Sequence, residues 1–217
     1  MATKPGNQPA VTYDAAGASD SDEIVRLLAR VFSQSEPPAV AMGLSFADFE
    51  QFLQIVVPNV IPNGLTVVSR TADTGELAGV LFTDDFATPP DVDLDRISPK
   101  FLPIFSMLET LDEQFRQGKA ILPNHYLHLF MLAVEARFAG QGIGQGLIRA
   151  CIDNGARKGY RTAVTEATGK VSQHAFRKNG FADRCSVSYQ SFRYENKLVF
   201  ASIREHEKAI LMDRSLA

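Results

Sequence analysis

The chain has 217 residues, of which 45% are hydrophobic and 22% are charged, and its formal net charge at pH 7 is -3. This length and composition exclude a disordered chain, a fibrous repeat and a disulfide-rich scaffold, and they favour one folded α/β domain with a sizeable core. The weakly acidic charge lacks the basic surface that nucleic-acid binding requires, so nucleic acid is not an expected partner.

The sequence favours a cytoplasmic protein without a membrane partner. No segment is long and apolar enough to cross a bilayer, and the opening residues MATKPGNQPA lack the apolar run of a secretory signal. The two cysteines, Cys151 and Cys185, do not form a CxxC pair, which suits a reducing compartment better than a disulfide framework. Residues 1–9 are predicted to be a disordered tail in front of a single domain over residues 10–217.

The first part of the chain predicts a short strand and two helices. A strand over residues 11–13 precedes apolar residues that recur at helical spacing over residues 23–32. This first helix is expected to end before the proline pair at 37–38. Ser45 and Asp48 then have the spacing of a capping box at the start of a second helix.

The second helix is expected to end near Pro58. Two β-rich runs over residues 65–69 and 77–82 are separated by a polar turn that ends in glycine, so they predict antiparallel neighbours in a sheet. Residues 84–100 are rich in proline and aspartate and predict a long exposed loop, followed by a third helix at about 101–117.

The next part of the chain predicts a strand–helix–strand crossover. A largely apolar strand over residues 126–134 is followed by a glycine-dense turn and by a helix whose apolar residues repeat over 143–152. A strand over 162–166 and a short helix near 171–178 come after it. This order predicts that the two strands are parallel, because a helix connects them.

The C-terminal residues predict a hairpin and a helix. Residues 186–192 and 197–203 have the pattern of two strands, and residues 205–213 that of a short helix. An edge of this hairpin would offer backbone groups through which two copies could pair as a homodimer.

The segment Ala139–Gly144 lies between the predicted strand and helix of the crossover. Consecutive backbone N–H groups and the positive end of a helix converge at such a turn, which predicts a site for a phosphate-bearing cofactor. Its glycines do not fit the GxGxxG fingerprint of dinucleotide-binding domains. A P-loop is also excluded, since no Gly-Lys pair in the sequence is followed by serine or threonine.

The segment Leu132–Ile148, LAVEARFAGQGIGQGLI, resembles the acetyl-CoA motif of the GCN5-related N-acetyltransferase (GNAT) superfamily. Gly142 and Gly144 match the glycines of that motif, whereas Ala139 stands where the family has glutamine or arginine. This departure removes a side chain but keeps the backbone amides. The resemblance implies an α/β (α+β) GNAT fold, with a mixed central sheet of about six to seven strands, a splayed pair of parallel strands and flanking helices.

The same resemblance implies acetyl-CoA as the cosubstrate. The cofactor phosphates are expected on the backbone of the glycine-rich turn, and the pantetheine arm on the exposed backbone of the strand before it. The cofactor-binding residues implied in this way are Leu132, Ala133, Val134, Ala139, Gly140, Gln141, Gly142, Ile143, Gly144 and Gln145. No metal is expected, because the four histidines show no ligand spacing with carboxylates or cysteines.

The segment Thr168–Phe181 resembles a later motif of the family, a short helix that ends at a Gly-Phe pair beside the cofactor. Many members carry a tyrosine four residues before that glycine, which protonates the leaving thiolate; this chain has Phe176, so that donor is absent. Arylalkylamine N-acetyltransferases, a subgroup that the chain also resembles, place hydroxyl residues where Thr168 and Ser172 stand. They also carry an acidic Glu-Pro pair after the first helix, and Glu36 holds that position here.

The resemblance to this subgroup makes Glu36 the candidate general base, with the two hydroxyl residues assisting on the thiol side. A base is needed because an ammonium is not a nucleophile, so the acceptor amine must lose a proton before it attacks the thioester. Two alternatives for Glu36 stay open: a solvated loop acid before a proline pair, and a substrate-binding group without proton transfer. Glu166, Asp84 and Asp85 are further candidates for the base.

The function implied by the resemblance is an acetyl-CoA-dependent N-acetyltransferase. It would acetylate a primary amine, favoured to be a small molecule, by direct attack in a ternary complex. Phe46, Phe49, Phe52 and Phe86 could line the acceptor pocket, although core packing explains the phenylalanines of the second helix equally well. Two alternatives are a protein or peptide amine as acceptor and a non-catalytic acyl-CoA-binding module.

Overall fold

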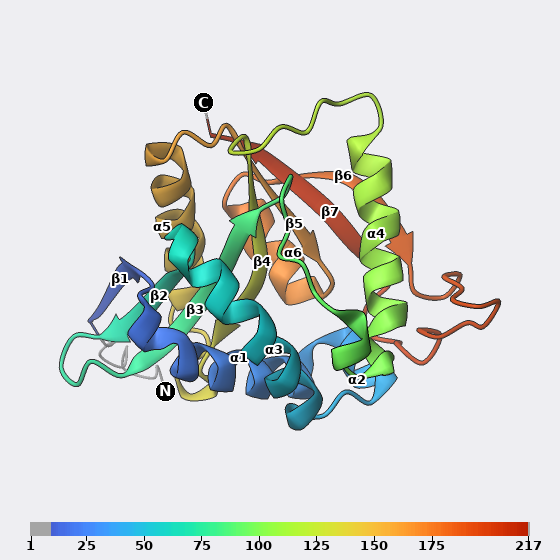
Figure 1. Cartoon of the computed structure of the whole chain (residues 1–217), viewed down its shortest axis with the longest axis horizontal. Helices are drawn as coiled ribbons and strands as arrows, with labels where there is room; N and C mark the ends of the chain where they lie inside the picture. The colour runs from blue at the N-terminus through green and yellow to red at the C-terminus, as the bar shows by residue number, and fades with distance from the viewer. Residues whose placement is uncertain (1–9, 217) are drawn as a thin grey trace, which may run out of the picture.

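A computed structural model describes residues 10–216 of the chain, so the predicted disordered tail over residues 1–9 lies outside the described residues. Its centre is a seven-stranded mixed sheet in the order β1-β2-β3-β4-β5-β7-β6. Buried side chains of α1, α3 and α4 share one hydrophobic core, and those of α5 and α6 share a second core. Figure 1 shows these two groups of helices on opposite faces of the sheet.

Apart from the additional helix α2, the elements follow the predicted order through α6. The strands are β1 (Val11–Ala15), β2 (Val67–Thr71), β3 (Leu77–Asp85), β4 (Tyr126–Val134), β5 (Thr162–Ala167), β6 (Ala182–Ser188) and β7 (Lys208–Ser215). The α-helices are α1 (Ser21–Ser35), α2 (Pro37–Met42), α3 (Phe46–Val60), α4 (Leu102–Arg116), α5 (Ile143–Arg157) and α6 (Lys170–Lys178). Short 3-10 turns lie at Ala18–Asp20, Ile61–Asn63, Leu94–Arg96, Pro99–Phe101 and Ala136–Phe138.

The parallel pair of strands, β4 and β5, separates after a short ladder. Residues 126–128 of β4 pair with residues 162–164 of β5, and the ladder then stops. The hydroxyl of Thr165 donates to the carbonyl of Leu129 at 2.8 Å, one step beyond the last pair. From there β4 continues beside β3, while β5 continues beside β7. The predicted splayed pair is therefore confirmed, and it leaves an edge of β4 facing the opening.

α1 ends at Ser35, before the proline pair as predicted, but a helix that was not predicted follows it. The proline pair at 37–38 begins the additional helix α2, because proline lacks only an N–H that the first turn of a helix does not use. α3 ends at Val60, near Pro58 as predicted, and Pro58 is exposed in its last turn. The predicted capping box is confirmed, since Ser45 Oγ accepts from the Asp48 amide at 3.1 Å.

The prediction for the C-terminal residues was wrong. β6 ends at Ser188, residues 189–207 form a folded connection, and β7 occupies the segment expected to be a helix. The run Ala209–Met212 is buried because β7 pairs with β5 on one side and β6 on the other. A short, continuous apolar run does not distinguish a buried strand from a helix, and this caused the error. The edge strands are β1 and β6, and the homodimer stays a prediction.

Candidate active site

Glu36 lies where α1 ends and α2 begins. Its Oε2 accepts a hydrogen bond from the Ala39 amide at 2.5 Å, which caps α2, and its carboxylate also accepts from the side chain of Thr168. The residue as a whole is partly exposed, but its carboxyl group is enclosed. Burial raises the pKa of Glu36 to about 7, although the two hydrogen bonds act in the opposite direction. A carboxyl group with this pKa exchanges protons readily near neutrality.

Thr168 follows the last residue of β5 and so lies at the open end of the splayed strands. Its side chain reaches Glu36, and its carbonyl accepts a hydrogen bond from the Tyr189 hydroxyl at 2.6 Å. Tyr189 is fully buried; burial and the nearby charge of Glu36 raise the pKa of its hydroxyl far above the ordinary value. The hydroxyl of Tyr189 therefore stays protonated and serves as a donor.

Ser172 lies in the first turn of α6, next to the same end of β5. Its hydroxyl donates to the Gly169 carbonyl at 2.8 Å and accepts from the Gly169 amide at 3.3 Å. The side chains of Pro37 and His206 both approach Gly169, and His206 Nδ1 accepts from the Lys170 amide at 3.2 Å. The structure thus brings Thr168 and Ser172 to the segment that carries Glu36, but only Thr168 contacts its carboxylate.

The glycine-rich turn leads directly into α5. Gly140 and Gly142 have φ angles of 75° and 82°, in the left-handed region that favours glycine, and Gly142 is the N-cap of the helix. The first helical hydrogen bond after the turn runs from the Gly146 amide to the Gly142 carbonyl at 3.0 Å. The amides of residues 143–145 precede this bond, and such amides are the donors that a helix start presents to an anion.

The turn lies against the strand that was expected to hold the pantetheine arm. A Cβ built at Gly144 would come within 3.8 Å of the side chains of both Leu132 and Val134. On the other side, Gln145 Oε1 accepts a hydrogen bond from the side-chain amide of Asn179 at 2.7 Å, which connects α5 to the end of α6. The glycine-rich turn therefore packs directly against the end of β4, the strand whose edge faces the opening between β4 and β5.

A model of the acetyltransferase (GNAT) family matches residues 34–181, which include Glu36, Thr168, Ser172 and the whole glycine-rich turn. The chain belongs to the GNAT family. This membership confirms the family expected from the sequence motifs and the assignment of the protein as an acetyltransferase enzyme. The matched residues end before Tyr189 and His206, so the family pattern makes no statement about either of them.

Solved structures share the fold over nearly the whole chain. The C-terminal condensation domain of Ebony in complex with beta-alanyl-dopamine has a TM-score of 0.88 and 15% identity, covering 95% of this chain and 99% of its own. Arylalkylamine N-acetyltransferase 2 from Aedes aegypti has a TM-score of 0.81 and 21% identity, with coverages of 95% and 99%. The Drosophila melanogaster polyamine N acetyltransferase has a TM-score of 0.72 and 15% identity, with coverages of 95% and 100%.

A buried charged cluster lies at the vertex of the splayed strands of this GNAT domain. The ring nitrogens of His128 lie 2.8 Å from Asp84 Oδ1 and 2.7 Å from Glu166 Oε2, so one imidazole bridges β3, β4 and β5. Burial lowers the pKa of His128, but the two carboxylates outweigh it and hold that pKa well above its ordinary value. His128 is therefore an imidazolium between two carboxylates, and not simply the packed or surface histidine that the sequence favoured.

Asp112 of α4 completes the cluster by a hydrogen bond to Glu166. Burial, with the adjacent charge of Glu166, raises the pKa of Asp112 to about 8. At neutral pH, Asp112 is thus a protonated donor to the carboxylate of Glu166. The pKa of Glu166 is lowered because His128 and these hydrogen bonds outweigh its burial, and a carboxylate held in this way is a weak base.

The other two candidate bases are also held by partners. Asp84 and Asp85 are buried residues of β3, not the start of an exposed loop as predicted. Asp84 is bound to His128, while Asp85 accepts from the amides of Ala87 and Asn124 and from the Tyr160 hydroxyl. These contacts favour Glu36 over either aspartate as the base.

Replacing Asp112 with asparagine is expected to change the free energy of unfolding, relative to the wild type, more favourably at pH 8 than at pH 5. The folded-state pKa of about 8 exceeds the ordinary value of 3.8, so the stability that Asp112 supports at low pH is lost as pH rises through this interval. Asparagine does not titrate and keeps a donor for Glu166. Relative to the wild type, we expect the variant's free energy of unfolding to gain up to about 4 kcal/mol between pH 5 and pH 8, because the interval spans three pH units at about 1.4 kcal/mol each.

Urea unfolding of the wild type and of Asp112→Asn at pH 5 and pH 8 measures this difference. The exposed Asp153, on α5, supplies the control: Asp153→Asn should show no comparable dependence on pH. An Asp112→Asn effect that is the same at both pH values would contradict a buried, protonated Asp112.

Two of the phenylalanines of α3, Phe49 and Phe52, belong to the hydrophobic core and not to an acceptor wall. The rings of Phe49 and Phe52 are buried and each lie 5.1 Å from the ring of Phe101, so they pack α3 against the segment before α4. Phe46 is 40% exposed, and Phe86 is buried with its ring 5.5 Å from the ring of His128. Core packing, the alternative that the sequence left open, is therefore correct for Phe49 and Phe52.

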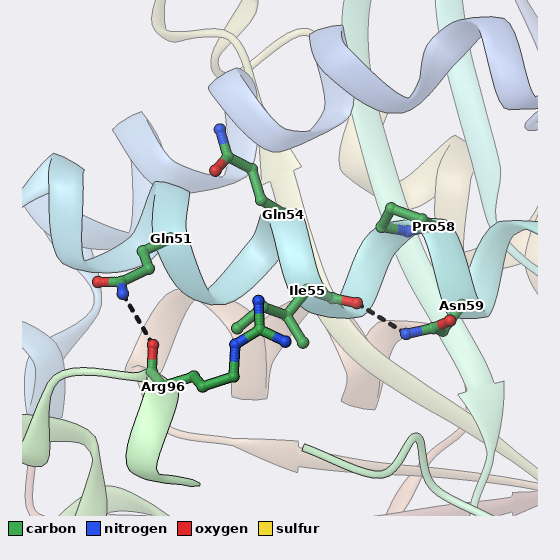
Figure 2. Close-up of a pocket in the computed structure, with 6 residues that line it drawn as sticks. All are labelled: Gln51, Gln54, Ile55, Pro58, Asn59 and Arg96. Atoms are coloured by element: carbon green, nitrogen blue, oxygen red, sulfur yellow. Dashed lines mark hydrogen bonds between the residues drawn. The ribbon is translucent and has the colours of Figure 1, made fainter. Parts of the chain in front are cut away.

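Two surface cavities lie apart from Glu36 and Thr168. The first, of about 470 Å³, is on the outer side of α3; Figure 2 shows Gln51 bonded to the Arg96 carbonyl and Arg96 lying beside Ile55. The second, of about 540 Å³, lies between α5 and α6. It is lined by Arg149, Ile152, Asp153, Lys178, Asn179, Gly180 and Arg214. Neither cavity is lined by a candidate catalytic residue.

Residues 10–216 offer neither a metal site nor a membrane-spanning helix. No three side chains of histidine, cysteine, aspartate or glutamate gather there in a form that could hold a metal ion. No helix in the same residues has both the length and the apolar character to cross a membrane.

Proposed function

We propose that this protein transfers the acetyl group of acetyl-CoA to the primary amine of a small molecule, by direct attack in a ternary complex. The observation that carries the proposal is the buried carboxyl group of Glu36, with its pKa of about 7, at the open end of the splayed strands. A base of this pKa is largely ionised at slightly alkaline pH and still accepts a proton from an ammonium group as the amine attacks.

Glu36 acts on the acceptor side of the reaction. It takes a proton from the ammonium group, the free amine forms the new C–N bond at the thioester carbon, and the tetrahedral intermediate expels the thiolate. A positioned base contributes typically about 10²–10⁴-fold to such a reaction. Most of the remaining rate comes from holding the amine and the thioester together.

The leaving thiolate must receive its proton from a residue other than the tyrosine that many members of the family use. Phe176 stands at that position, is buried, and packs its ring 5.1 Å from the ring of Phe181. The hydroxyls of Ser172 and Thr168 are the proposed donors at this end of α6; because they donate to the Gly169 carbonyl and to Glu36 in this structure, either would turn toward the thiolate to protonate it. Their assignment to the thiol side remains part of the proposal.

The residues beside the opening fit acetyl-CoA. The backbone of Ala139, Gly140, Gln141, Gly142, Ile143, Gly144 and Gln145 would hold the pyrophosphate, and the edge of β4 at Leu132, Ala133 and Val134 would pair with the pantetheine arm. Bound acetyl-CoA supplies the activated acyl group. A β4 amide that donates to the developing oxyanion would contribute about 2.7–4 kcal/mol of transition-state stabilisation.

A small amine is the acceptor that the comparisons favour. The Aedes aegypti relative is an arylalkylamine N-acetyltransferase, and the Drosophila melanogaster relative is a polyamine N-acetyltransferase that catalyses the formation of N-acetylagmatine. By analogy, we include arylalkylamines, diamines and agmatine as acceptors for this chain. Lysine peptides test the alternative of a protein acceptor.

Initial-rate kinetics test the proposal. Thiol release from acetyl-CoA is followed while both substrates are varied, and calorimetry measures acetyl-CoA binding without an acceptor. Intersecting reciprocal plots with a small amine support a ternary complex, whereas parallel plots indicate a covalent acyl-enzyme. Acetyl-CoA binding without turnover on any amine or peptide favours the non-catalytic acyl-CoA-binding module.

The pH dependence of kcat/KM is expected to show an acidic limb near pH 7. Glu36 must be ionised to accept a proton, so the rate falls as pH decreases through its pKa of about 7. The profile is measured with a fixed acceptor at saturating acetyl-CoA. A limb near pH 4.5, the ordinary value for glutamate, would contradict the environment described for Glu36.

A further inference from the structure

The connection between β6 and β7 begins with a tyrosine that lies near the candidate base. This connection, residues 189–207, extends from the sheet at the right of Figure 1. Its first residue, Tyr189, is 0% exposed, and its ring lies 5.9 Å from the ring of Phe200 in an edge-to-face arrangement. Phe192 stacks on Phe200 at 5.5 Å, and the Tyr189 amide donates to the Glu207 carbonyl at 3.1 Å. These contacts fix the position of the tyrosine ring.

The hydroxyl of Tyr189 reaches Glu36 through one intermediate residue. It donates to the Thr168 carbonyl at 2.6 Å, and the side chain of Thr168 in turn hydrogen-bonds to the Glu36 carboxylate. Three segments that are distant in the sequence thereby meet at one point: the start of α2, the residue after β5 and the start of the β6–β7 connection.

We propose that Tyr189 is a positioning residue for the general base: by fixing the backbone of Thr168, it holds the Thr168 hydroxyl on the carboxylate of Glu36. This inference rests on the proposed function, in which Glu36 accepts the proton of the acceptor amine. Tyr189 lies beyond residues 34–181, so the family match does not assign it a role.

The groups that face Glu36 determine the direction in which a change at Tyr189 shifts the pKa of Glu36. They are the Ala39 amide of α2, the Thr168 side chain after β5 and the Tyr189 hydroxyl, while His206 and Lys170 meet nearby at Gly169. The bonds from Ala39 and Thr168 stabilise the ionised carboxylate against the cost of burial. A loosened Thr168 therefore leaves Glu36 protonated to a higher pH.

The test compares Tyr189→Phe with the wild type across the pH range. We expect kcat/KM at pH 6.5 to fall roughly three- to tenfold, the effect of one lost hydrogen bond. The ratio of variant to wild type should return toward one above pH 9, where the base is ionised in both proteins. KM for acetyl-CoA should not change.

Three further variants complete the test. Tyr194→Phe removes a hydroxyl from the same connection and should leave the profile unchanged. Thr168→Val removes the hydroxyl that contacts Glu36 and should move the acidic limb in the same direction as Tyr189→Phe. The double variant Tyr189→Phe/Thr168→Val should add little to Thr168→Val alone, because both changes break one chain of contacts.

An equal loss of kcat/KM at every pH, or an acidic limb that does not move, would overturn the role of Tyr189. If Tyr189→Phe does not fold, Thr168→Val decides the matter: an unmoved limb overturns the proposed chain of contacts and a raised limb supports it. If the wild type has no acidic limb near neutrality, both this inference and the assignment of Glu36 fail. If the wild type shows an acidic limb that is absent in Glu36→Gln, the proposed function stands, whatever the result with Tyr189→Phe.

Discussion

Replacing Glu36 with glutamine is expected to lower kcat about 10²–10⁴-fold at neutral pH, which is the typical contribution of a positioned base. Glutamine keeps the size of the side chain, and its carbonyl oxygen can still accept from the Ala39 amide, so the cap of α2 is retained. It cannot accept a proton from the acceptor ammonium. The deficit should shrink as pH approaches the pKa of the amine, since more of the acceptor is then already deprotonated.

Steady-state thiol release from pH 6 to pH 10 measures this effect. Glu113→Gln is the matched control, because Glu113 is an exposed glutamate on α4 away from the splayed strands. Its activity should equal that of the wild type. A Glu36→Gln variant that retains more than about a tenth of the wild-type kcat at pH 7 would contradict general-base catalysis by this residue.

Replacing Gly142 with alanine is expected to weaken acetyl-CoA binding about tenfold while kcat at saturation changes little. The φ of 82° at this position lies in the left-handed region, which costs a residue with a Cβ about 1–2 kcal/mol. Relief of that strain would move the amides of the following residues, which are the donors proposed for the pyrophosphate. The cost should therefore appear in the affinity for acetyl-CoA.

Gly75→Ala separates this effect from general strain. Gly75 has a φ of 71° in the turn between β2 and β3, and, as at Gly142, a Cβ there would meet no atom within 4 Å. Both variants should lose similar stability in urea unfolding, but only Gly142→Ala should bind acetyl-CoA more weakly in calorimetry. Equal affinity in the two variants would contradict a phosphate site at the glycine-rich turn.

The sequence predicted the strand, the glycine-rich turn and the helix start better than the contacts around Glu36. The glycine-rich turn and the strand before it are adjacent in the chain, so their spacing alone indicated a site for a phosphate group. The crossover from β4 through α5 to β5 followed from the period of the apolar residues. The roles of Glu36 and Thr168 were expected only through the resemblance to a known subgroup, and the contact between them was not predicted.

The parts that were missed depend on contacts between distant residues. His128 was predicted to be packed or exposed, because the sequence does not show that Asp84 and Glu166 lie on the strands beside it. The same holds for Asp112, whose proton depends on burial beside Glu166, and for Tyr189, which begins the long connection between β6 and β7. β7 was mistaken for a helix since its apolar run has no clear period, and its pairing with β5 and β6 decides its conformation.

The most direct test of the proposed function is to measure thiol release and product formation in the same reaction. Purified protein is incubated with acetyl-CoA and a panel of arylalkylamines, diamines, agmatine and lysine peptides, and mass spectrometry identifies the acetylated species. We predict one N-acetylated small amine for each thiol released, and almost none with Glu36→Gln. Acetylation of peptides alone, or thiol release without any N-acetylated amine, would contradict the account.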